Sequence, residues 1–128
     1  MNVLPGACLC AAACLSGCAS EVVRHPAEMS APAARSGLVV TTQTTSFTLD
    51  SGYSRAIDQG TEFVELGSIK EGRVLKPTKT AFTIEGAHMH EAYPVVRDGR
   101  LVGFYLPVEK AFSPLSSAAS FPTQKRNP

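Results

Sequence analysis

Turn glycines divide the middle of the chain into short segments, and this spacing limits its possible folds more than any other feature. Between residues 37 and 112 they lie at positions 52, 60, 72, 86 and 99, at intervals of 8, 12, 14 and 13 residues. A helical crossover between parallel strands needs a dozen or more residues in addition to the strands themselves. The spacing therefore predicts a meander of short antiparallel strands.

Two segments show the alternation of a half-buried strand most clearly. Residues 44–49 read Thr-Thr-Ser-Phe-Thr-Leu and residues 80–85 read Thr-Ala-Phe-Thr-Ile-Glu, each with a period of two. Five or six such strands fit between residues 37 and 112. We therefore expect a mainly β domain, either a small antiparallel barrel or a curled sheet of the SH3-like size class. A domain this short buries only about 60% of its unfolded surface, so its core is marginal.

A hairpin is predicted around Asp98-Gly99, because these residues supply the positive φ angles of a two-residue type I′ turn. Pro94 cannot donate a ladder hydrogen bond, which indicates an unpaired side or a bulge at that strand. The face opposite the expected core face carries fewer apolar side chains but is not polar, so the hairpin is either covered on both sides or packed on a partner. The expected pairs are Arg97 with Arg100, Val96 with Leu101, Val95 with Val102 and Tyr93 with Phe104, and the expected core face holds Tyr93, Val95, Val102, Phe104 and Leu106.

The segments that flank the strands are rich in Ala, Ser and Pro. Residues 19–36 show no sustained apolar period and read as a flexible tether that spans about 20 to 25 Å. Residues 113–128 read as a solvated, disordered tail; the alternative is that residues 116–120 pack against the domain. The predicted organisation from residue 19 onward is thus a tether over 19–36, a β domain over 37–112 and a tail over 113–128.

The chain begins with an apolar run over residues 3–15, which has the length of the h-region of a signal peptide. It is shorter than the roughly 20 residues that a membrane-spanning helix requires. Its n-region, Met1-Asn2, lacks Lys and Arg, which indicates either a mis-set start codon or a marginal signal. The alternative is an ordinary buried helix of a cytosolic protein, although no further apolar helix is predicted for it to pack against.

All four cysteines lie in or directly after this run, at positions 8, 10, 14 and 18. Their surroundings are apolar and no second half-site follows, so the spacing does not indicate a zinc or iron–sulfur site. If the leader is removed before Cys18, one cysteine remains and no intramolecular disulfide is possible.

The segment Leu15-Ser16-Gly17-Cys18 resembles the lipobox of bacterial lipoproteins. The resemblance implies a signal peptide over residues 1–17, which is cleaved between Gly17 and Cys18. It also implies that the segment 18–36 begins with an acylated Cys18, which carries a diacylglyceryl group and an N-acyl chain. Because Ala19 rather than Asp follows the cysteine, it also implies residence in the outer membrane, on the periplasmic face; the alternative is the outer face of the cytoplasmic membrane. Residues 101–107 resemble a closing stretch of small lipoproteins of Gram-negative bacteria, to which no activity is attached.

The charge distribution of the chain does not indicate a surface that binds nucleic acid. Its 12 basic and 11 acidic residues leave a net charge of +1, and the basic residues are scattered along the chain. We therefore expect no nucleic-acid partner. The expected partners are the membrane, through the lipid, and a protein of the envelope.

The segment His88-Met89-His90 is the one cluster in the sequence whose side chains are suited to metal binding or other chemistry. On a strand, both imidazoles would point to the same face about 6.5 to 7 Å apart along the backbone, a spacing at which they can reach one Zn or Cu ion. A third ligand would have to be a distant carboxylate, such as Asp58, Glu85 or Glu109. The alternative is that His88 and His90 occupy a solvated face at the start of a strand, with no metal or other cofactor.

Motifs for catalysis are missing from the sequence. It contains no Gly-x-Ser-x-Gly elbow and no phosphate-binding glycine loop at a strand-to-helix junction. We expect no enzyme, but a lipid-anchored envelope protein with a structural or protein-interaction role. Two alternatives are a periplasmic metal or small-ligand binder that uses the two histidines, and an accessory subunit of an envelope secretion or assembly machine.

Overall fold

The computed structural model describes residues 21–32 and 37–127, and these residues form a mainly β structure without a helix. The expected signal peptide and the lipobox residues 15–18 lie outside the described residues. No helix in the described part is long and apolar enough to cross a membrane. The strands are β1 (His25–Pro26), β2 (Leu38–Thr41), β3 (Thr45–Thr48), β4 (Ser54–Ile57), β5 (Glu62–Ile69), β6 (Gly72–Pro77), β7 (Thr83–Glu85), β8 (Met89–Glu91), β9 (Tyr93–Arg97), β10 (Arg100–Leu106), β11 (Ala111–Ser120) and β12 (Thr123–Arg126).

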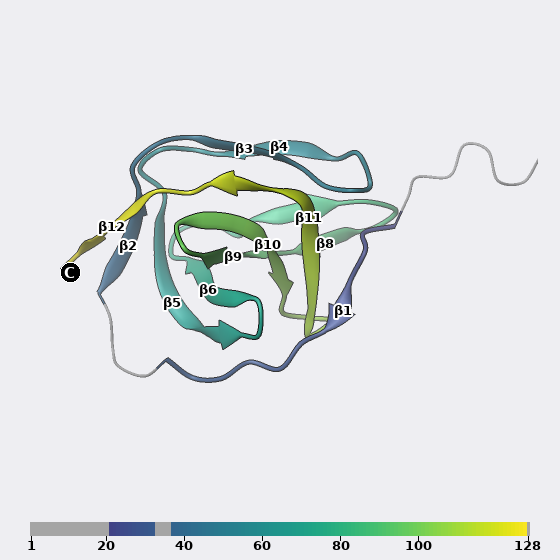
Figure 1. Ribbon diagram of the computed structural model, residues 1–128, viewed down its shortest axis with the longest axis horizontal. Helices are drawn as coiled ribbons and strands as arrows, with labels where there is room; N and C mark the ends of the chain where they lie inside the picture. The colour runs from purple at the N-terminus through teal and green to yellow at the C-terminus, as the bar shows by residue number, and fades with distance from the viewer. Residues whose placement is uncertain (1–20, 33–36, 128) are drawn as a thin grey trace, which may run out of the picture.

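Eight of the strands form one antiparallel sheet in the order β1-β11-β10-β9-β6-β5-β2-β12. Two small ribbons, β3-β4 and β7-β8, lie beside it (Figure 1). The sheet curls but is not closed into a barrel. This confirms the curled antiparallel sheet and excludes the closed barrel for the described part of the chain.

The C-terminal segment is part of this sheet, so the prediction of a disordered tail over 113–128 is wrong for residues 113–126. Strand β11 pairs with β10, whereas β12 pairs with β2 near the opposite edge. Phe121, between the two strands, is fully buried, and its N–H donates to the carbonyl of Gly99 over 2.8 Å. The sequence did not indicate these two strands, because the second half of β11 consists mainly of small residues and has the composition of a linker.

The N-terminal segment is also packed, which corrects the prediction of a flexible tether for residues 21–32. Val22 is buried, β1 pairs with β11, and Ser30 forms an isolated bridge with Ser68 of β5. Gly67 makes this path possible, because a Cβ there would collide with the carbonyl of Ser30 and the side chain of Met29. The domain therefore includes residues 21–32 and 113–126 in addition to the expected range 37–112.

The β9–β10 hairpin has the predicted turn but not the whole predicted register. Asp98 and Gly99 have φ angles of 51° and 74°, and Arg97 and Val96 pair with Arg100 and Leu101 as expected. A bulge at residue 102 then shifts the ladder by one residue. As a result Val95 pairs with Gly103, Pro94 with Phe104 and Tyr93 with Tyr105.

The bulge divides the predicted core face between two hydrophobic clusters on opposite faces of the sheet. Both faces are covered, one by the two ribbons and the other by the N-terminal segment around Ala27 and Met29. Phe104 and Leu106 belong to the first cluster, and Tyr93, Val95 and Val102 to the second. The buried residues are Val22, Val39, Phe47, Leu49, Ile57, Phe63, Leu75, Ile84, Ala92, Val96, Leu101, Phe104, Leu106, Leu115 and Phe121 in the first cluster, and Ile69, Val74, Tyr93, Val95, Tyr105 and Phe112 in the second.

Candidate functional site

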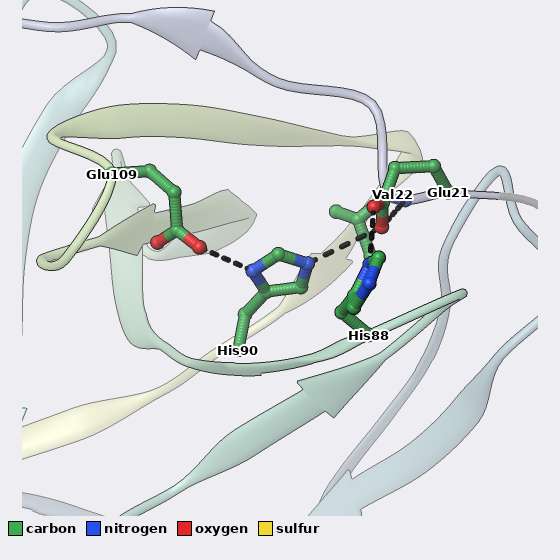
Figure 2. Close-up of polar contacts among 5 residues, drawn as sticks. All are labelled: Glu21, Val22, His88, His90 and Glu109. Atoms are coloured by element: carbon green, nitrogen blue, oxygen red, sulfur yellow. Dashed lines mark hydrogen bonds and ion pairs between the residues drawn. The ribbon is translucent and has the colours of Figure 1, made fainter.

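Two histidines and two glutamates form a hydrogen-bonded group where the N-terminal segment meets the β7–β8 ribbon (Figure 2). We call Glu21, His88, His90 and Glu109 the histidine–carboxylate cluster. Glu21 comes from the N-terminal segment, His90 from β8, His88 from the residue just before it, and Glu109 from the turn between β10 and β11. The cluster thus joins three segments that are far apart in the sequence.

His90 is the centre of the cluster, and only 5% of its side chain is exposed. It pairs with Ile84 of β7, which is fully buried, and this places its ring on the inner face of the ribbon. Its Nδ1 lies 2.5 Å from Oε2 of Glu109, and its Nε2 lies 3.3 Å from Oε1 of Glu21. Both nitrogens can donate to these carboxylates at once only in the imidazolium form.

His88 lies at the rim, with 76% of its side chain exposed. Its Nδ1 is 2.9 Å from Oε2 of Glu21. The two imidazoles therefore approach one carboxylate, but the expectation that both occupy a solvated outer face is wrong for His90. Its ring is buried because it shares the inner face of the ribbon with Ile84, a member of the first hydrophobic cluster.

Glu21 bridges the two histidines, and neighbouring donors stabilise its charged form. The hydrogen bond from His88, that from the backbone N–H of Val22 at 2.9 Å and that from His90 lower the pKa of Glu21 to about 2, against a small opposing effect of desolvation. The carboxylate is 39% exposed, so it is screened by solvent and its effect on stability is modest. Glu21 was missed by the sequence analysis; the only signal for it is the pair Val22-Val23, which is unusual in an Ala/Ser/Pro-rich segment.

Glu109 is held by a turn with an uncommon backbone. The next residue, Lys110, has a φ of 54°, the left-handed region that side chains other than Gly, Asn and Asp rarely adopt. The carbonyl of Lys110 accepts a hydrogen bond from the N–H of Ala27 over 3.1 Å, so the same turn also holds the N-terminal segment. Oε1 of Glu109 is buried and has no hydrogen-bond partner within the described residues.

The structure brings together only some of the predicted metal ligands. Of the three carboxylates considered, Glu109 contacts a histidine, whereas within residues 37–127 neither Asp58 nor Glu85 forms such a contact. No group of three or more His, Cys, Asp or Glu residues in the described part of the chain has the arrangement of a metal site. In this arrangement the cluster is a hydrogen-bonded clasp, with each nitrogen of His90 directed at a carboxylate.

Two hollows lie away from the cluster. One, of about 280 Å³, lies between β4, β5 and the segment 77–82, with Phe63 and Phe82 among its lining residues. Arg55 also lines it and is engaged there, since its guanidinium lies 4.2 Å from the centre of the Phe82 ring and donates to the carbonyl of Thr83 over 2.7 Å. The other, of about 570 Å³, is a more open groove between the β3–β4 ribbon and residues 116–119.

Comparisons with known proteins identify no relative. No protein-family model, no curated protein and no solved structure matches the chain.

Proposed function

We propose that this chain is a bacterial envelope lipoprotein, anchored through Cys18, whose β domain is a non-catalytic interaction module held close to the membrane. The lipobox-like segment Leu15–Cys18 supports the anchor. The expected location of the protein is the periplasmic side of the outer membrane, because Ala19 rather than Asp follows the cysteine.

The chain is already attached to the β domain at Glu21, three residues after Cys18. This observation supports the proposal that the domain lies close to the membrane. Three extended residues span at most about 11 Å. Glu21 is held by His88 and His90, and the next side chain, Val22, is buried in the first hydrophobic cluster. An acylated Cys18 would therefore hold the domain at the bilayer surface, much closer than an 18-residue tether would.

The geometry of His90 supports a non-catalytic role. A histidine that acts as a general base directs one nitrogen at a hydroxyl, thiol or water. Here both ring nitrogens are directed at carboxylates, and one of these carboxylates belongs to the segment that follows the proposed anchor. The cluster therefore fits a device that fastens the N-terminal segment to the domain.

Intact-mass analysis of the membrane fraction tests this proposal. The expected species lacks residues 1–17 and carries the added mass of two or three acyl chains on Cys18, which together make anchoring effectively permanent. The C18S variant should accumulate as an uncleaved, unacylated precursor, whereas C14S should be processed normally and serves as the matched control. An unmodified chain that begins at Met1 in the cytosol would refute the proposal.

Sorting is tested separately by fractionation. Wild-type protein should accompany outer-membrane markers, and A19D should move to the inner membrane. If wild-type protein accompanies inner-membrane markers, the outer-membrane placement is wrong while the anchor itself stands.

A further inference from the structure

The exposed large apolar side chains of the described residues are unevenly distributed. There are five of them: Val23 at 42% exposed, Val64 at 36%, Leu66 at 38%, Met89 at 66% and Val108 at 77%. Val23, Met89 and Val108 each lie within two positions of a member of the histidine–carboxylate cluster. Met89 and Val108 are the two most exposed of the five. The remaining two belong to β5.

These three residues lie on segments that meet at one end of the molecule. The tip of the β7–β8 ribbon, strand β1 and the turn before β11 are found at the right of Figure 1, whereas β5 lies toward the left. Contacts hold the three segments together: Glu21 contacts His88, and Ala27 donates to Lys110. We call this end of the domain, represented by Val23, Met89 and Val108, the apolar end.

The chain outside the described region indicates what covers the apolar end. Twenty residues precede Glu21, and they include Cys18 three positions away. Because Glu21 contacts the residue that precedes Met89 in the chain, the tip of the β7–β8 ribbon lies within a short reach of the proposed acyl chains. A link of this length keeps the part of the domain around Glu21 close to the bilayer.

We propose that the apolar end lies on the lipid surface of the membrane, with Met89 and Val108 entering the interfacial region. This inference rests on the proposed acylation of Cys18. Single apolar residues on a surface need no explanation, but these occur at the end that the anchor would hold against lipid. Side chains that enter the headgroup boundary add to the lipid anchor and give the domain one orientation, with β5 directed away from the bilayer.

The natural chain contains no tryptophan, so a single introduced tryptophan reports on one position. The experiment uses the full-length lipidated protein in vesicles of phosphatidylethanolamine and phosphatidylglycerol, with variants M89W and V108W. Val64 on β5 supplies the matched control V64W. Intact mass confirms acylation of each variant, and circular dichroism confirms its β structure.

For M89W and V108W we expect emission shifted to the blue and quenching by brominated lipid about twofold or more stronger than for V64W, as for residues at the headgroup boundary. Adding E21Q and H88A to M89W should weaken the quenching while the protein remains acylated, because the clasp no longer holds the end near the anchor. Equal quenching of all three tryptophans in acylated protein would overturn the orientation but leave the anchor intact. Protein without acyl chains would instead refute the anchor, and the orientation with it.

Discussion

The carboxylate of Glu21 lies 2.9 Å from Nδ1 of His88, although 67 positions separate the two residues in the chain. The same carboxylate approaches Nε2 of the buried His90. Through these contacts the segment that follows the proposed lipidation site becomes part of the β domain. Three residues instead of eighteen thus separate Cys18, the proposed lipidation site, from the domain.

The clasp should depend on pH through Glu21. The pKa of this carboxyl is lowered from 4.5 to about 2, so its stabilising effect is fully present above pH 4.5 and is lost as the pH falls toward 2. E21Q should therefore be less stable than wild type at pH 7, and the difference should shrink between pH 4.5 and pH 2. Urea unfolding of both proteins at a series of pH values measures this difference in the free energy of unfolding.

E28Q is the matched control, because Glu28 is an exposed glutamate of the same segment. Its difference from wild type should stay small at every pH. A difference for E21Q that does not change between pH 7 and pH 2 would show that the carboxylate is not bound by the histidines.

Gly67 should be intolerant of a side chain. A Cβ at this position would meet the carbonyl of Ser30 and the sulfur of Met29, so G67A should displace the N-terminal segment and cost about 1 to 3 kcal/mol of unfolding free energy. Hydrogen exchange should become faster in residues 27–31 while the central strands stay protected. L66A, an exposed neighbour, should stay within about 0.5 kcal/mol; equal effects of the two changes would contradict the close packing.

The two faces of the β9–β10 hairpin should be equally sensitive to truncation. Val95 and Phe104 are both fully buried, although in different clusters, so V95A and F104A should each cost about 2 to 5 kcal/mol. R97A and R100A, at the exposed turn, should stay within about 0.5 kcal/mol. Denaturant unfolding gives all four values, and arginine variants as damaging as the core variants would mean that the turn is wrongly placed.

The C-terminal segment should contribute to stability. Phe121 is fully buried, with its ring centre 6.1 Å from that of Phe63, so F121A should cost about 3 to 5 kcal/mol. K125A, exposed on β12, should change the free energy of unfolding by about 0.5 kcal/mol or less. If F121A unfolds like wild type, the segment after β11 does not belong to the core.

The candidate site could be predicted only in part. His88 and His90 were recognisable as a pair because two imidazoles at this spacing are uncommon, and Glu109 was among the carboxylates considered. Glu21 was not, because a single acidic residue beside Ala, Ser and Pro has the composition of a tether. Contact over 67 residues depends on the path of the whole sheet, and no local pattern encodes it.

The antiparallel β class and the Asp98-Gly99 turn could be predicted from local sequence, since both follow from rules of periodicity and backbone sterics. The tertiary structure determines the bulge at Val102, because one extra residue moves every later side chain to the opposite face and the packing of both faces selects the register. It also decided that residues 21–32 and 113–126 belong to the domain. Their composition lacks a strong apolar period, and they are ordered because they cover a core that the other strands leave open.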